Sequence, residues 1–183
     1  MNERYYTDRL ILSVLDEEFS DLTREFYYSG REAFARVEPK KEDVFYSPSY
    51  QRALLRNEYS AFLEESYARY FFFLRDNPDK IIGTVSLANI QRGPYNSCTI
   101  GYKLLPEFQK KGYALEGIAR IITAAFNDWN IHRIEAFVLP DNVNSISLLK
   151  RLGFSLEGVA KSIIRLNDSY VDHNRYVIIN PGD

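Results

Sequence analysis

Residues 113–129 carry the strongest helical pattern in the chain. Their apolar side chains recur at spacings of three and four, so they form one stripe along a helix. Strand-like runs lie on both sides, at residues 97–105 and 133–139. A strand, a helix and a second strand in this order predict a βαβ unit, in which the striped helix packs on a sheet. The stripe consists of Leu115, Ile118, Ile122, Ala125, Phe126 and Trp129.

The rest of the chain predicts further strands and helices around this unit. We expect helices at residues 17–28, 49–69 and 141–152, and strands at residues 9–15, 70–75, 80–90, 154–166 and 170–179. Residues 30–46 are charged and irregular, which is typical of a surface segment. No repeat and no long linker divides the chain, so residues 1–183 are expected to form a single domain with its core at residues 7–179. The predicted fold is α/β, with a mixed, mainly antiparallel sheet of about seven strands flanked by about four helices.

The turn Gln109-Lys110-Lys111-Gly112-Tyr113-Ala114 lies between a strand and the striped helix. A helix N-terminus presents unpaired N–H groups and a partial positive charge, and both favour a phosphate group. Glycine lets the backbone approach such an anion closely. The pattern Gln/Arg-x-x-Gly-x-Gly/Ala occurs by chance about 0.2 times in a chain of this length. The strand before it and the helix after it therefore carry much of the prediction that this turn binds phosphate.

Other phosphate-binding and hydrolytic motifs do not fit the sequence. Gly112 and Gly117 have the spacing of a Walker A loop, but Ile118 and Ala119 stand where lysine and serine or threonine are required. The dinucleotide pattern G-x-G-x-x-G and the nucleophile elbow G-x-S-x-G are both absent. We interpret the turn as a cradle formed by backbone N–H groups.

Charge and cysteine content narrow the possible functions and locations of the protein. The 23 basic and 25 acidic residues give a net charge of -2, which disfavours nucleic-acid binding. The lone Cys98 cannot form an internal disulfide and is expected to be filler, which fits a cytoplasmic location. No signal peptide is visible, and the apolar run at residues 70–74 is too short for a membrane span. The 14 tyrosines suggest an exposed groove or an interface, which leaves a homodimer open.

A metal centre is not expected. His132 and His173 are the only histidines, so no H-E-x-x-H motif exists. The pair Asp172-His173 is the one weak candidate for a metal contact.

Four short segments occur in the order of one known family. They are Thr7-Asp8-Arg9-Leu10, then Gly101-Tyr102 with residues 109–116, then Pro140-Asp141-Asn142-Val143-Asn144-Ser145, and finally Leu152-Gly153-Phe154-Ser155-Leu156-Glu157-Gly158. With these segments the chain resembles the GNAT superfamily of N-acetyltransferases, in the RimJ/RimL branch that acetylates the N-termini of ribosomal proteins. The resemblance spans residues 7–179. It implies a GNAT-like sheet with a splayed strand pair, and acetyl-CoA as the acetyl donor, without a metal.

The resemblance also implies roles for single residues. Backbone groups of Lys103, Leu104 and Leu105 would pair with the pantetheine arm, and Asn142 would bind that arm as well. Backbone N–H groups of the turn would hold the pyrophosphate, and Ser145 would lie near the cofactor sulfur. Two departures stand out, because the family commonly has a small residue in place of Lys110 and alanine in place of Gly117. The implied cofactor-binding set is Lys103, Leu104, Leu105, Gln109, Lys110, Lys111, Gly112, Tyr113, Ala114, Asn142 and Ser145.

The implied reaction is direct attack of a neutral amine on the thioester within one ternary complex. Ser145 is the expected proton source for the leaving thiolate, with helix capping as its alternative role. The backbone N–H of Leu104 or Leu105 is the expected oxyanion donor. Glu135 is the first candidate for a general base, directly or through water, with an ion pair to Arg133 as its alternative. Glu116 and Glu157 are expected to be structural, Glu116 by stabilising its helix start.

The acceptor is the least determined part. A protein N-terminal α-amine is favoured by the resemblance alone, and a small-molecule amine such as a polyamine, an antibiotic or an amino acid is the alternative. A non-catalytic acyl-CoA-binding module is the third interpretation. The aromatic candidates for the acceptor pocket are Tyr27, Tyr28, Phe34, Tyr170 and Tyr176.

Overall fold

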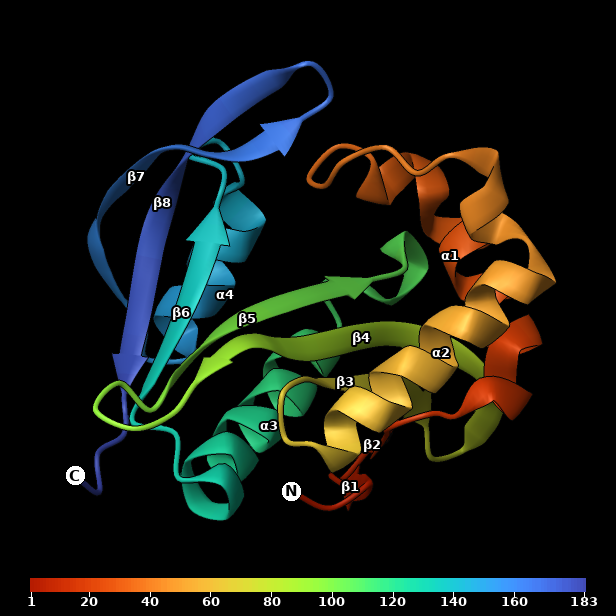
Figure 1. The fold of residues 1–183 in the computed structure, drawn as a ribbon, viewed down its shortest axis with the longest axis horizontal. Helices are drawn as coiled ribbons and strands as arrows, with labels where there is room; N and C mark the ends of the chain where they lie inside the picture. Colours follow the sequence, from red (N-terminus) through yellow and green to blue (C-terminus); the bar gives the residue numbers. More distant parts are fainter.

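Eight strands form one open sheet in the computed structural model, which describes residues 1–183 (Figure 1). The strand order is β1-β2-β3-β4-β5-β6-β8-β7, and every neighbouring pair is antiparallel except β5 and β6. The predicted mixed, mainly antiparallel sheet is thereby confirmed. The strands are β1 (Arg4–Tyr6), β2 (Leu10–Ser13), β3 (Ala68–Leu74), β4 (Asn77–Gln91), β5 (Ser97–Leu104), β6 (Arg133–Val138), β7 (Ser155–Leu166) and β8 (Ser169–Ile179).

Four α-helices cover the two faces of this sheet. Figure 1 shows α1 and α2 over one face and α3 and α4 on the opposite face. None of these helices is long and apolar enough to cross a membrane. The α-helices are α1 (Ser20–Phe34), α2 (Pro48–Leu63), α3 (Tyr113–Trp129) and α4 (Val143–Arg151), and short 3₁₀ turns occur at η1 (Glu17–Phe19), η2 (Asp43–Tyr46) and η3 (Pro106–Phe108).

Several predicted boundaries were wrong in the first half of the chain. Strand β1 was missed, because three residues with only Tyr5 buried are too short to show a period. Helix α1 extends to Phe34, since Phe26, Gly30 and Phe34 continue its buried face. Helix α2 ends at Leu63, six residues early, and Glu65 beyond it has a left-handed φ of 53°. Helix α3 begins and ends as predicted.

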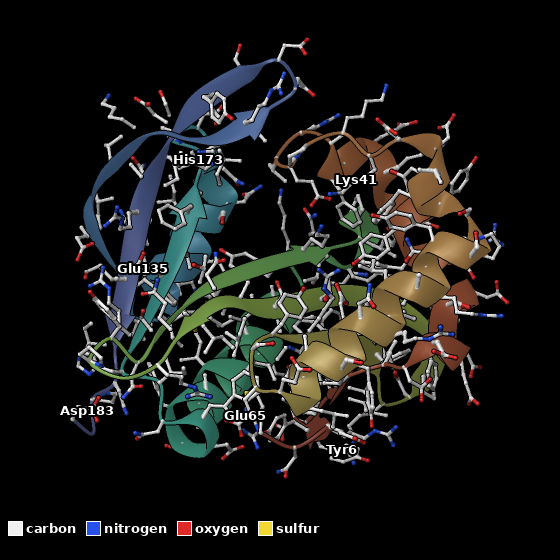
Figure 2. The ribbon with its side chains drawn as sticks, in the orientation of Figure 1. Tyr6, Lys41, Glu65, Glu135, His173 and Asp183 are labelled. Carbon is white, nitrogen blue, oxygen red and sulfur yellow. The ribbon has the colours of Figure 1, made fainter.

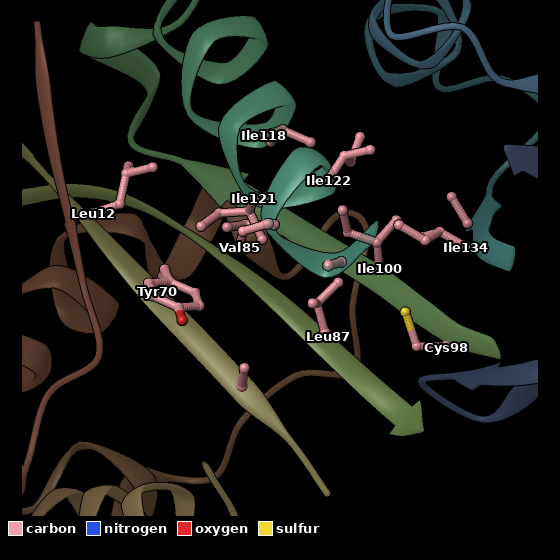
Figure 3. Packing of buried hydrophobic residues seen from close by; sticks show 14 of the residues in the cluster. Leu12, Tyr70, Val85, Leu87, Cys98, Ile100, Ile118, Ile121, Ile122 and Ile134 are labelled. Atoms are coloured by element: carbon pink, nitrogen blue, oxygen red, sulfur yellow. The ribbon is translucent and has the colours of Figure 1, made fainter. Parts of the chain in front are cut away.

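The core divides into two clusters, one on each face of the sheet. The larger cluster joins α3 to the sheet, with Ile118 and Ile121 packed near Val85 and Ile100 (Figure 3). Cys98 lies within this cluster and is 2 % exposed, which agrees with its expected role as filler. The smaller cluster packs aromatic residues of α1 and η2 against the other face. The sheet lies between most of these two clusters, so a path through it requires a break between strands.

Gly117 shows why α3 lacks a side chain at its contact with the sheet. A Cβ atom there would lie 2.7 Å from ring carbons of Phe72 and 3.2 Å from Leu10. We expect Gly117→Ala to destabilise the protein by about 1–3 kcal/mol, because overpacking exceeds the gain of up to about 1 kcal/mol in helix propensity. Urea unfolding of the two proteins tests this expectation. A more stable alanine variant would contradict it, since it would show that Phe72 moves aside without cost.

Candidate functional site

The sheet opens between β5 and β6. These strands pair only where residues 97–99 lie beside residues 133–135, and beyond that point they diverge (Figure 1). This is the splayed strand pair that the resemblance implies. A cavity of about 290 Å³ occupies the opening. It is lined by Phe34, Val37, Glu38, Arg69, Thr84, Ser86, Ile100, Gly101, Tyr102, Lys103, Ala136, Phe137, Val138, Leu139, Asn142, Ser145 and His173.

The cavity passes from one face of the sheet to the other. Side chains alternate along a strand, so Ile100 and Tyr102 face the α3 side, whereas Gly101 and Lys103 face the α1 side. Residues from both sets line the cavity. Two molecules approaching from opposite faces can therefore meet between β5 and β6.

The turn before α3 has the backbone shape of an anion cradle. Lys110 and Gly112 both have left-handed dihedrals, with φ of 59° and 86°. Gly112 is the N-cap of α3 and provides no side-chain cap, and the first backbone bond of the helix runs from Glu116 N to Gly112 O at 3.1 Å. The N–H groups of the first helical turn are therefore unpaired within the helix and available to an anion.

Arg9 ties this turn to the start of β2. Its Nη1 donates to the carbonyl oxygen of Lys111 at 3.0 Å, and its Nε donates to Glu116 at 2.7 Å. The guanidinium also lies 4.6 Å from the ring centre of Tyr113. Because a peptide group is planar and trans, holding the Lys111 carbonyl directs the N–H of Gly112 the opposite way. Arg9 therefore orients a donor of the cradle, a role that the sequence did not suggest.

Glu116 is the anchor for Arg9. Its carboxylate accepts hydrogen bonds from the Thr7 hydroxyl at 2.6 Å and from the Arg9 backbone at 2.9 Å. Partial burial alone would raise the pKa of Glu116, but these hydrogen bonds outweigh it and hold the pKa below its usual range. Glu116 is thus an ionised residue held by Thr7 and Arg9, and its predicted effect on the start of α3 stays a prediction. The Thr7-Asp8-Arg9-Leu10 segment acts on the turn through it.

The free edge of β5 offers fewer backbone groups than expected. The N–H of Leu105 donates to the carbonyl of Ile82 at 2.9 Å. Hydrogen-bonded pairs alternate along antiparallel strands, so the backbone N–H and C=O groups of Lys103 also point toward β4. The backbone groups of Leu104 and Tyr102 point toward the opening instead. The carbonyl of Leu104 accepts from the Gln109 side chain at 3.1 Å. Of the two expected oxyanion donors, the N–H of Leu104 is therefore the one that faces the opening.

Ser145 and Tyr102 form a hydroxyl pair in the cavity. Their oxygens are 2.7 Å apart. The cap of α4 is instead Asn142, whose Oδ1 accepts from Ser145 N at 3.1 Å, so the hydroxyl of Ser145 is not committed to capping. Burial raises the pKa of Tyr102 to about 12, although Ser145 opposes this, so the phenol is protonated at neutral pH. The pair places two protonated hydroxyl groups on the α3 side of the opening.

The charged groups on the α1 side are already paired. Lys103 forms an ion pair with Glu38, and burial lowers the pKa of Lys103 while Glu38 opposes that effect. Arg69 forms an ion pair with Glu58 at 3.1 Å and donates to the hydroxyl of Tyr27. These pairs give this half of the cavity a polar wall with no large excess of either charge.

Several predicted site residues lie away from the cavity. Glu135 is hydrogen-bonded to Arg133 at 2.7 Å and does not line it, which favours the ion-pair alternative. Figure 2 shows Glu135 well below His173 along the two strands. Of the five aromatic candidates only Phe34 lines the cavity, because Tyr27 and Tyr176 are buried in the two cores and Tyr28 and Tyr170 are exposed.

Asp172 is engaged with its own hairpin. It accepts hydrogen bonds from Lys161 at 2.7 Å and from the Ser162 backbone at 2.8 Å. No three of the His, Cys, Asp and Glu side chains gather in a group that could hold a metal ion. His173, its neighbour, instead lines the cavity.

Comparison with known proteins gives consistent results. A model of the acetyltransferase (GNAT) domain matches residues 9–155. A probable N-acetyltransferase of Bacillus subtilis is 34% identical over 154 residues, which cover 84% of each chain. The structure of the ribosomal-protein-S5-alanine acetyltransferase of Vibrio fischeri is similar with a TM-score of 0.92, at 27% identity over 98% of each chain. The RimJ protein of Mycobacterium smegmatis, solved with a CoA disulfide, shares the fold with a TM-score of 0.86 at 21% identity, over 93% of this chain and 81% of that one.

Proposed function

This chain belongs to the acetyltransferase (GNAT) domain family, and from that premise we propose that it transfers the acetyl group of acetyl-CoA to the α-amine of a protein N-terminus. The cavity that crosses the sheet between β5 and β6 carries this proposal. It connects the α3 face, where Tyr102 and Ser145 line it, to a polar pocket on the α1 face lined by Glu38 and Lys103. A direct transfer between two bound substrates requires such a connection.

The residues on the α3 face fit the donor. The uncapped start of α3, with left-handed Lys110 and Gly112, provides N–H groups for a diphosphate. The N–H of Leu104 faces the opening and would stabilise an oxyanion. Asn142 lines the cavity and keeps its amide NH₂ free for the pantetheine arm, because only its Oδ1 is used by the cap. Acetyl-CoA would supply an activated thioester there, and the RimJ protein solved with a CoA disulfide supports this choice.

The acceptor follows from proton chemistry and from the relatives. An α-amine with a pKa of about 8 is deprotonated at pH 7 for about 1.4 kcal/mol, whereas a lysine side chain costs nearly 5 kcal/mol, at about 10.4. The one carboxylate of the cavity lining, Glu38, is paired with Lys103, and such a cavity favours the more acidic ammonium. The Vibrio fischeri relative is named for an alanine of a ribosomal protein. We therefore propose that the acceptor is the N-terminus of a ribosomal or similar protein and that the reaction takes place in the cytoplasm.

The proposal is tested by binding and by turnover. Calorimetric titration with acetyl-CoA should give a saturable signal, and CoA thiol release should then be followed with peptides that begin with alanine or serine. Polyamines, free amino acids and an aminoglycoside serve as competing acceptors. No heat at millimolar acetyl-CoA would overturn the donor assignment. Thiol release from small amines alone would replace the peptide acceptor, and binding without release would identify a non-catalytic module.

Arg9→Ala is expected to raise KM for acetyl-CoA by about tenfold, as the loss of one charge-assisted hydrogen-bond set near 1.5 kcal/mol implies. The reason is that the Lys111–Gly112 peptide would lose the contact that orients it. Acetyl-pantetheine has no diphosphate and is expected to be a weaker acetyl donor. Its KM should change little in the Arg9→Ala variant. Arg75→Ala, which removes an exposed guanidinium that donates only to the Thr7 carbonyl, is the matched control. An equal rise in KM for acetyl-CoA and for acetyl-pantetheine would show a general structural effect instead.

A further inference from the structure

His173 is a buried histidine that opens onto the cavity. It is 2 % exposed and belongs to the cavity lining. Asn174 pairs with Val138, the last residue of β6, so His173 lies just beyond that strand at the open end of the gap. Arg175 pairs with Phe137 on the α1 face. Because side chains alternate along β8, His173 faces the same side, where the acceptor would enter.

The tautomer of the neutral imidazole ring follows from its contact with the backbone. Nδ1 lies 3.2 Å from the carbonyl oxygen of Val171. A carbonyl oxygen can only accept, so Nδ1 carries the hydrogen in the neutral ring and Nε2 carries the lone pair. No side chain or backbone group of the protein bonds to Nε2. The tautomer is the one that a general base requires.

The other titratable groups of the cavity are committed to partners. Glu38 and Lys103 form an ion pair, and Arg69 forms one with Glu58. Tyr102 is protonated and bonded to Ser145. His173 is therefore the one titratable side chain of the lining that is bonded to no other side chain.

We propose that His173 is the general base that takes a proton from the ammonium group of the acceptor. The inference rests on the proposed function. Ammonium gives one proton to Nε2, which passes it to water, and the neutral nitrogen then forms a bond to the thioester carbon. The carbon–sulfur bond breaks as the Ser145–Tyr102 pair protonates the sulfur, and the second nitrogen proton restores that pair. The base and the acid thus stand on opposite faces of the opening.

Charged groups around His173 come as pairs of opposite sign. Asp172, its neighbour in β8, is paired with Lys161, and Arg175 is paired with Glu157. Ala160 lies opposite it in β7. Across the cavity stand the Glu38–Lys103 pair and Arg69, itself paired with Glu58. No lone charge therefore faces the ring.

The variant His173→Gln tests the proposal. At pH 7 we expect turnover with an alanine peptide to fall about 100-fold, as general-base removal typically does, with unchanged affinity for CoA by calorimetry. The deficit should shrink above about pH 8, where the amine is already neutral. His132→Gln is the matched control, because His132 is exposed and bonded to Asp183 at 2.6 Å, and it should leave the rate unchanged. A deficit that is the same at all pH values would overturn the proposal.

A measurement on the unaltered protein keeps the test independent of folding. The acid limb of kcat/KM should stay at one pH for acceptor peptides whose amines differ in pKa, because a base on the protein, and not the amine, would then control the rate. A limb that follows the amine pKa would remove His173 from the reaction. If the unaltered protein releases no thiol with any amine, the proposed function fails, whereas activity with a limb that tracks the amine refutes only the role of His173.

Discussion

Gly112→Glu is expected to weaken acetyl-CoA binding by at least about 100-fold, or about 2.7 kcal/mol. Gly112 has a φ of 86°, a conformation that a side chain strains. A Cβ atom there would lie 3.0 Å from Nη2 of Arg9, which orients the turn. The added carboxylate would also occupy the unpaired N–H groups at the start of α3 and repel the diphosphate. Calorimetric titration with CoA measures the loss directly.

Gly112→Ala separates the strain from the charge. It introduces the same left-handed strain and the same contact with Arg9, but no carboxylate, so we expect a loss of about tenfold. Thermal unfolding should show that both variants remain folded. If Gly112→Glu binds CoA as tightly as the unaltered protein, the diphosphate does not bind at this turn.

The sequence predicted those parts of the fold that have a strong local period. The stripe of α3 is long and continuous, so both ends of that helix were found. The preceding turn was found because glycine and an uncapped helix start are local signals. Strand β1 was not predicted, because only one of its three side chains is buried. The end of α2 was predicted too late, because Tyr67 continues the apolar spacing beyond it. The left-handed residue Glu65 ends the helix before that point.

The functional side chains depend on strand register, which the sequence does not contain. Glu135 and His173 are both polar residues of predicted strands. The pairing places Glu135 where β5 and β6 are joined, and His173 where they have separated. A shift of one residue would turn His173 to the other face. This is why the general base suggested by the sequence and the one inferred from the structure differ.

The contact of Arg9 with Glu116 and the Lys111 carbonyl could not be predicted from the sequence either, for a different reason. Arg9 and Glu116 are separated by 107 residues, so no local pattern joins them. The resemblance marked both segments without saying that they touch. Tyr102 was likewise part of a recognised motif, but its hydroxyl acquires a role only because α4 places Ser145 2.7 Å away.

Ser145→Ala is expected to lower kcat by about 100-fold, which corresponds to about 2.7 kcal/mol of transition-state stabilisation, with little change in CoA affinity. The leaving thiolate would lose its proton source, whereas the cap of α4 depends on the side chain of Asn142 and on the backbone of residue 145. Steady-state kinetics at saturating acetyl-CoA, together with calorimetry, separate the two effects. An unaltered kcat would show that the thiolate is protonated by water or by another group.

Tyr102→Phe decides whether the two hydroxyls act as one donor. Their oxygens are in contact, and burial keeps the phenol protonated through the neutral range. If a proton is relayed from Tyr102 through Ser145 to the sulfur, each single variant interrupts the same relay. The double variant should then be no slower than Ser145→Ala, because residues that act as a unit are not additive. Losses that multiply in the double variant would instead assign separate roles, with Ser145 acting on the sulfur and Tyr102 packing the cofactor arm.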